Sequence, residues 1–142
     1  MWSDIVLRAE QQHLLRLLLW AGLSVLGATA VATTTAGRRV QSPLLKHFAL
    51  QMAAWGAVVG VIAAMELRTL ELRDISGATR LERLAWMNIG LDVGYVAVGI
   101  ALGACAWAIA RRLAPVGAGV AIAVQGLALL LIDLQFAAAI AR

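Results

Sequence analysis

The sequence predicts an all-α fold, an antiparallel four-helix transmembrane bundle connected up-down-up-down. Composition is the first reason, since 62% of the 142 residues are hydrophobic and 14% are charged, against about 45–50% and about 25% in soluble domains. The second is that the apolar residues fall into four stretches, each long enough for the roughly 20 helical residues that cross a bilayer. The third is that none of the stretches alternates with period two, as the strands of a membrane β-barrel do. We therefore expect a single domain over residues 1–142.

The four predicted spans cover about residues 14–36, 48–67, 84–110 and 115–141. Within lipid, a helix satisfies every backbone N–H and C=O group inside its own segment. Polar residues interleaved with apolar ones flank the spans near the N-terminus and after the second span. We therefore expect helices one and two to project beyond the membrane on the face that holds the N-terminus. The few residues between the last two spans predict a tight antiparallel hairpin.

Residues at the boundaries predict where the helices begin and end. Gly37 is expected to close the first helix in a left-handed conformation. Ser42 followed by Pro43 is typical of a helix start, with the serine as the N-cap. Thr79 and Glu82 match the T-x-x-E capping box, which predicts the start of the third helix.

Polar side chains at bilayer depth are the candidate functional residues, because ionisable groups are costly there. Asp92 and Asp133 each lie about eight residues from the N-terminal face, roughly 12 Å along a helix. We therefore expect two carboxylates at one depth on neighbouring helices. Arg16 is the best-placed cation to pair with them. The ligand-binding set expected in this interior is Arg16, Gln51, Asn88, Asp92, Tyr95, Gln125 and Asp133.

Two carboxylates in a dry site do not comfortably both ionise, so several interpretations stay open. They could share a proton, take the guanidinium of Arg16 as counter-ion, or bind a metal cation. A structural interpretation is that Asn88, Tyr95 and Arg16 satisfy the two aspartates, which then only fix helix register. A contact with another subunit is the remaining interpretation.

Small residues predict close helix packing. Three pairs have the G-x-x-x-G spacing, which lets helix backbones approach in lipid: Gly56 with Gly60, Gly90 with Gly94, and Gly99 with Gly103. We expect them to pack within one bundle, with a homo-oligomer interface as the alternative. On this interpretation helix three presents no broad face to lipid.

Signatures of enzymes and cofactors are absent. There is no H-E-x-x-H, no C-x-x-C, no phosphate-binding loop and no nucleophile elbow, so we expect a non-enzymatic protein with no cofactor and no metal. The net charge of +4 does not indicate nucleic-acid binding, because the basic residues are divided between two membrane faces. The lipid bilayer is the expected partner. His13 is expected to contact lipid headgroups.

Two motifs in the last two helices resemble a known family. Residues 88–95 read N-x-x-L-D-x-x-Y and residues 125–133 read Q-G-x-x-L-L-x-x-D. In order and separation these resemble an uncharacterised family of small bacterial four-helix membrane proteins, one of the domains of unknown function. The resemblance covers about residues 46–133 and implies a four-span protein of the bacterial inner (cytoplasmic) membrane. It supports testing the polar residues of both motifs and implies no activity or cofactor.

The leading functional hypothesis is a non-enzymatic scaffold or accessory subunit, with a structural polar core and small-residue faces that join a homo-oligomer or a larger membrane complex. The alternative is a small-ligand, ion or proton-binding membrane protein, possibly transport-related, that uses Asp92 and Asp133. Direct hydrogen bonds sealing both carboxylates would exclude the alternative. A quinone or pigment site at Trp55 and Tyr95 is a third hypothesis.

Overall fold

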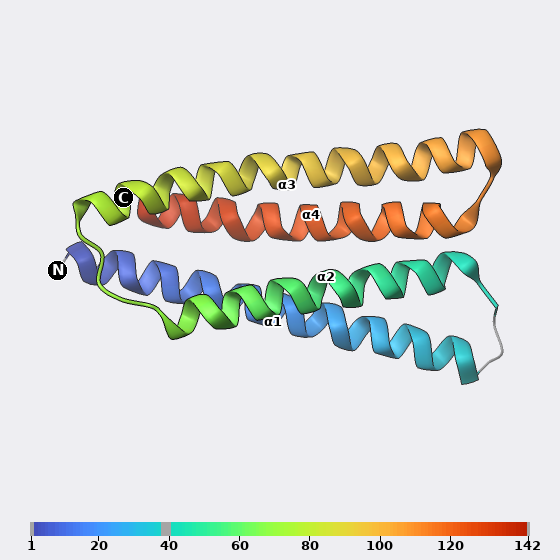
Figure 1. Ribbon diagram of the computed structural model, residues 1–142, viewed down its shortest axis with the longest axis horizontal. Helices are drawn as coiled ribbons and strands as arrows, with labels where there is room; N and C mark the ends of the chain where they lie inside the picture. Colours follow the sequence, from blue (N-terminus) through green and yellow to red (C-terminus); the bar gives the residue numbers. More distant parts are fainter. Residues whose placement is uncertain (1, 38–40, 142) are drawn as a thin grey trace.

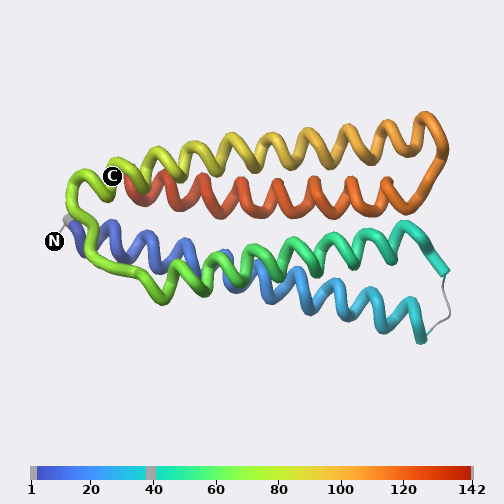
Figure 2. Tube along the Cα trace, in the orientation of Figure 1, coloured from blue at the N-terminus to red at the C-terminus, as the bar shows by residue number. Residues whose placement is uncertain are grey.

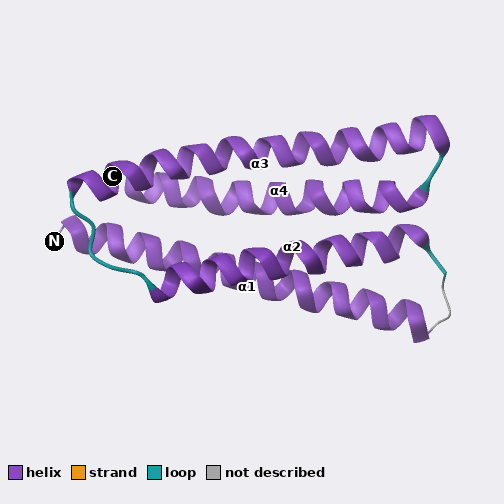
Figure 3. Cartoon of the chain, viewed as in Figure 1, coloured by secondary structure: helices purple, strands orange, loops and turns teal. Residues whose placement is uncertain are grey.

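The computed structural model describes residues 2–37 and 41–141, which form four helices and no strand. These are α1 (Trp2–Gly37), α2 (Pro43–Arg68), α3 (Ile75–Ala110) and α4 (Leu113–Ile140), drawn in Figure 1 and Figure 3. Each helix is long and apolar enough to cross a membrane. The predicted all-α class and the number of helices are confirmed for the described part of the chain.

The four helices extend along the long axis of the molecule (Figure 1, Figure 2). Both chain termini and residues 69–74 lie at one end, called the terminal end below. The connection at residues 111–112 and the start of α2 lie at the other, called the hairpin end. α1 packs against α2, and α3 packs against α4, which also contacts α2 and α1. α4 is therefore the central helix.

The ends of α1 and α2 agree in part with the sequence expectations. The polar N-terminal segment continues directly into the first span, as expected. Ser42 caps α2, because its Oγ accepts a hydrogen bond from the backbone N–H of Leu45 at 3.3 Å. The left-handed conformation expected at Gly37 is wrong, since Gly37 is the last helical residue of α1 and no described glycine has a positive φ.

The connection between α2 and α3 corrects two further expectations. α2 ends at Arg68 and does not project by additional turns, whereas α3 begins early, at Ile75. Asp74 is its N-cap, with a carboxylate that accepts from the backbone N–H of Gly77 at 2.7 Å. The capping box predicted at Thr79 is wrong, because the aspartate five residues earlier already satisfies a free N–H of the first turn.

Glycines let the helices approach closely at several places, including Gly99 and Gly56. A Cβ at Gly99 of α3 would lie 2.6 Å from the carbonyl oxygen of Gly119 in α4, and one at Gly56 of α2 would lie 2.7 Å from Cβ of Ser24 in α1. Real Cβ atoms essentially never approach so closely. These two contacts therefore need glycine.

α3 is the least covered helix. Its buried residues are Ala85, Asp92 and Gly99, which follow one another at intervals of seven. Gly90 and Gly94 have nothing within 4 Å of the Cβ position. The expectation that helix three lacks a broad exposed face is wrong, because this helix packs mainly on α4 and buries only one narrow stripe.

Candidate functional site

A buried acid and a buried base meet between α1 and α4. Nε2 of His13 lies 3.7 Å from Oδ1 of Asp133, and the two side chains are 9% and 8% exposed. The ring of His13 stacks on Phe136, with centroids 4.3 Å apart and planes 20° apart. Phe136 lies one helical turn beyond Asp133, so α4 supplies both the carboxylate and the surface that orients the imidazole.

α3 adds a second carboxylate, Asp92, which is buried. The backbone carbonyl oxygen of Asp92 would lie 2.9 Å from a Cβ atom built at Gly126 of α4. Because glycine has no Cβ, α3 and α4 can approach each other closely at this point. Asp133 lies seven residues beyond Gly126, which is roughly 10 Å of helix. The backbones of the two aspartates are therefore offset along the bundle. Because each side chain leans toward the N-terminal end of its own helix and α3 and α4 run in opposite directions, the two carboxylates lean toward one another across this offset.

Two polar atoms here are buried without a hydrogen-bond partner among the described residues. They are Nδ1 of His13 and Oδ2 of Asp92. Buried polar atoms in folded proteins are nearly always paired, and leaving one unpaired costs about 1–3 kcal/mol. We call His13, Asp92 and Asp133 the acid–base cluster. In the part of the chain that the structure describes, no three His, Cys, Asp or Glu residues form a group that could hold a metal ion.

Further ionisable groups connect the cluster with the terminal end. Glu10, one turn before His13 on α1, is buried and accepts two hydrogen bonds from Arg73, at 2.6 Å from Nη2 and 3.1 Å from Nε. The hydrogen bond to Glu10 raises the pKa of Arg73 above its ordinary value. Glu66 is exposed near the end of α2. Charged groups thus lead from the surface to the acid–base cluster.

Gln125 forms a separate polar contact deeper in the bundle. It is 1% exposed, and its Oε1 accepts from Nε1 of Trp20 at 2.6 Å. Its Nε2 donates to Oγ of Ser24 at 3.1 Å and to the carbonyl of Met52 at 3.5 Å. These bonds join α4 to α1 and α2 and use the Nε2 group and one of the two acceptor positions of Oε1, so Gln125 has the geometry of a structural residue.

A small cavity adjoins Gln125. Its volume is about 200 Å³, and its lining residues are Gln51, Trp55, Tyr95, Val98, Ile122 and Gln125. Trp55 and Tyr95 meet edge to face in its wall, with centroids 5.3 Å apart. Five of the seven predicted polar residues therefore separate into two groups: the two aspartates belong to the acid–base cluster, and Gln51, Tyr95 and Gln125 line the cavity.

Two predicted residues lie outside both groups. Arg16 is exposed and forms no ion pair with either aspartate within residues 2–37 and 41–141, so its role as counter-ion is wrong. It lies about 100° around the helix from the buried face of α1. Asn88 is also exposed, because it falls beside the narrow buried stripe of α3.

Sequence reasoning missed the base of the cluster. The expected headgroup contact of His13 is wrong, since this side chain is buried against Phe136 and Asp133. Glu10 was not singled out as an interior residue either. The signal was present, because Val6, Glu10 and His13 are spaced by four and three residues and so share one helical face.

Comparison with known proteins finds one family. The model of a family of unknown function, DUF6992, matches residues 16–134. The matched region includes Asp92, Gln125 and Asp133, whereas His13 and Glu10 precede it. No curated protein and no solved structure matches the chain.

Proposed function

Because the chain belongs to DUF6992, a family of unknown function, we propose its function from its own geometry: it is a membrane protein that takes up and releases a proton at the acid–base cluster. This proposal rests on one observation, the two buried atoms without partners, Nδ1 of His13 and Oδ2 of Asp92. A purely structural polar core satisfies its own groups, as Gln125 does. The acid–base cluster leaves two positions unfilled.

Protonation changes what these atoms can do. A carboxylate only accepts hydrogen bonds, whereas a carboxylic acid also donates one, and a protonated imidazole donates from both nitrogens. Two acids and one base in a site with little water cannot all carry charge without a large desolvation cost. A proton is therefore expected to be shared within the cluster, so that uptake and release belong to the group and not to one residue.

The surroundings of the cluster supply a path for the proton. Glu66 is exposed at the end of α2, and Glu10 is buried on α1 one turn before His13. Arg73 holds Glu10 in place with two hydrogen bonds. This arrangement supports exchange of the proton with water at the terminal end. Toward the hairpin end, α4 continues from Asp133 to Gln125, whose amide is bonded to Trp20 and Ser24.

Infrared difference spectroscopy of the full-length protein in lipid nanodiscs tests the proposal. Stepping the pH should reveal a carboxylic-acid C=O band from a buried acid. Asp92→Asn and Asp133→Asn should each remove or shift part of that band, because each deletes one carboxyl of the cluster. Asp74→Asn is the matched control, since this exposed acid caps α3 outside the cluster.

The proposal fails if the pH-dependent band is the same in wild type, Asp92→Asn and Asp133→Asn while circular dichroism shows all three folded. His13→Gln provides a second variant, which should shift the pH at which the band changes without deleting a carboxyl. Liposomes loaded with a pH-sensitive dye then distinguish proton binding alone from transport across the bilayer.

The setting of this activity is also part of the proposal. The four apolar helices support a multi-pass, up-down-up-down protein of the bacterial inner (cytoplasmic) membrane, with the bilayer as its immediate partner and no enzymatic role. Labelling of single cysteines placed at the two ends of the bundle tests the topology. Labels at residues 70 and 112 should react from opposite sides, and reaction from the same side would contradict it.

A scaffold or accessory-subunit role is the second candidate, favoured by the uncovered face of α3. Gly90 and Gly94 there have nothing within 4 Å, and the G-x-x-x-G spacing lets a second helix approach closely. Cross-linking in membranes should trap a homodimer that Gly94→Leu disrupts. Gly22→Leu, at another open glycine, is the control, and a monomer in wild-type membranes would refute this role.

A further inference from the structure

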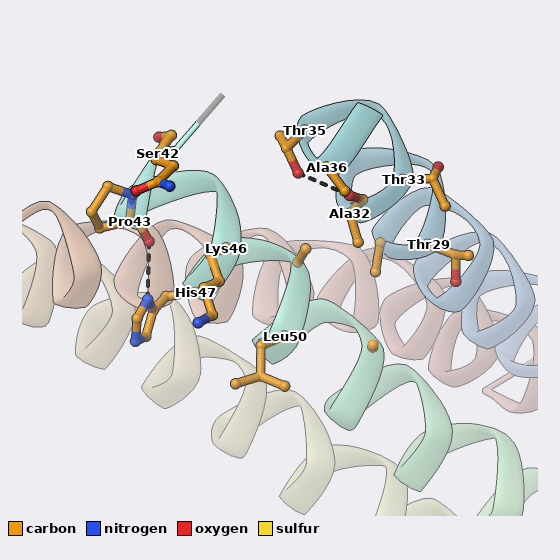
Figure 4. Close-up of a pocket in the computed structure, with 14 residues that line it drawn as sticks. Thr29, Ala32, Thr33, Thr35, Ala36, Ser42, Pro43, Lys46, His47 and Leu50 are labelled. Carbon is orange, nitrogen blue, oxygen red and sulfur yellow. Dashed lines mark hydrogen bonds between the residues drawn. The ribbon is translucent and has the colours of Figure 1, made fainter. Parts of the chain in front are cut away.

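A large cleft separates α1 and α2 at the hairpin end, remote from the acid–base cluster (Figure 4). Its volume is about 1330 Å³, and it is open to the outside of the bundle. Pockets for drug-sized ligands occupy about 300–1,000 Å³. This space is larger, and it runs along two helices that are apolar enough to cross a membrane.

The walls of the cleft are small and apolar. α1 contributes alanines and threonines, and α2 contributes Ala49, Leu50 and Ala53. The hydroxyls of Thr29 and Thr35 are already bonded to carbonyls of their own helix, at 2.8 Å from those of Val25 and Val31. They therefore present their methyl groups, and the interior of the cleft suits a hydrocarbon chain.

The mouth of the cleft is basic. Lys46 and His47 line it from the first turns of α2 (Figure 4). Lys46 is exposed and has no ion-pair partner within the described residues. Nδ1 of His47 lies 2.9 Å from the carbonyl oxygen of Pro43. When both ring nitrogens are protonated, Nε2 is therefore the N–H that is left to donate to a ligand.

No carboxylate of the chain competes for these cations. None of its eight Asp and Glu residues lies between positions 11 and 65 or between 93 and 132, so the hairpin end carries positive charge without acids. Ala53 lies seven residues beyond Lys46 on α2, which places roughly 10 Å of apolar cleft below the basic mouth. A molecule with a negatively charged headgroup and a hydrocarbon tail fits this cleft, with the headgroup at the basic mouth and the tail in the apolar part below it.

We propose that the cleft between α1 and α2 binds one anionic phospholipid, with its phosphate at Lys46 and His47 and one acyl chain between the two helices. The alanine and threonine face of α1 and the apolar face of α2 then contact lipid inside the bundle and not only at its outer surface. This site is independent of the acid–base cluster, which lies toward the opposite end.

Native mass spectrometry of the full-length protein, released from bilayers with equal amounts of phosphatidylglycerol and phosphatidylcholine, tests the lipid site. Wild type should retain one phosphatidylglycerol in preference to phosphatidylcholine. Lys46→Gln should weaken this retention about fivefold, the effect of one basic residue at an anionic membrane surface. Arg112→Gln is the matched control, because it removes the same charge at the same end and Arg112 makes no side-chain cap bond.

A second pair of variants tests the acyl chain. Ala32 lines the cleft, whereas Ala30 is exposed on α1 and does not. Ala32→Phe should fill the cleft and abolish lipid retention. Ala30→Phe makes the same substitution outside the cleft and should retain the lipid as wild type does. Equal retention in these two variants overturns the proposal.

Three further outcomes also overturn it. The first is equal loss of lipid in Lys46→Gln and Arg112→Gln, which would mean that general surface charge attracts the lipid. The second is equal retention of phosphatidylcholine, which would mean that the headgroup is not recognised. The third is displacement of the lipid by inorganic phosphate alone, which would make the site a simple anion site.

Discussion

Replacing Gly99 by alanine tests how α3 and α4 are held together. The new Cβ would meet the backbone of Ala123 and lie 2.6 Å from the carbonyl oxygen of Gly119. Reaching an ordinary contact of about 3.5 Å requires the two helices to separate by about 1 Å. Since the obstructing atoms belong to backbone, no side chain can rotate away, and we expect Gly99→Ala to lower the free energy of unfolding by about 1–3 kcal/mol.

Gly94→Ala is the matched control, five residues earlier in the same helix. Nothing lies within 4 Å of its Cβ position. The free energy of unfolding of Gly94→Ala should therefore equal that of wild type or exceed it by up to about 1 kcal/mol, because alanine favours a helix more than glycine does. Both free energies are measured by titrating the full-length protein with sodium dodecyl sulfate in mixed micelles, followed by circular dichroism. The packing argument is refuted if the two variants are equally stable.

Three other predictions concern polar contacts. Gln125→Leu removes the hydrogen bonds to Trp20 and Ser24. A hydrogen bond between membrane helices contributes about 0.6 kcal/mol on average and about 1.7 at most, so this variant should be less stable by about 1–2 kcal/mol in the same titration. Adding Trp20→Phe should then cost little, and full additivity would contradict the contact. Arg73→Gln leaves the buried carboxylate of Glu10 unpaired and should lower the free energy of unfolding by about 1–3 kcal/mol. Adding Glu10→Gln should restore much of this loss. A double variant no more stable than Arg73→Gln would contradict this account. Asp74 has a pKa lowered from 3.8, chiefly by the hydrogen bond from Gly77, so its stabilisation of α3 is present above that value and is lost as the pH falls below it. The protection factors of amide hydrogens in the first turn of α3, which correct for the intrinsic exchange rate, should fall below about pH 4 in wild type and show no such step in Asp74→Ala.

The helices and the two aspartates were predictable because their signals are local. Runs of apolar residues long enough for a bilayer, and acids within them, can be counted along the chain. The partners of the aspartates were not predictable in this way. α1 is apolar around much of its circumference, so its sequence does not strongly distinguish the face with His13 from the face with Arg16. That choice depends on how α1 packs against α2 and α4.

The offset between Asp92 and Asp133 has a related cause. Depth was inferred from the expected starts of the helices, but α3 begins at Ile75, capped by Asp74. The register of the α3 and α4 pair depends on which glycines meet which backbone, as at Gly99 and Gly126. Such contacts join residues far apart in sequence, and several glycines in each helix could have provided them.

The central position of α4 has a consequence for biosynthesis. A chain is made from its N-terminus, so α1, α2 and α3 leave the ribosome before the helix that touches all of them. Until α4 is inserted, His13 lacks its partner Asp133 and the indole N–H of Trp20 lacks its acceptor, Oε1 of Gln125. On the proposed membrane topology, the nascent protein therefore carries unsatisfied polar groups into the bilayer. Insertion machinery or water must shield these groups until the bundle is complete.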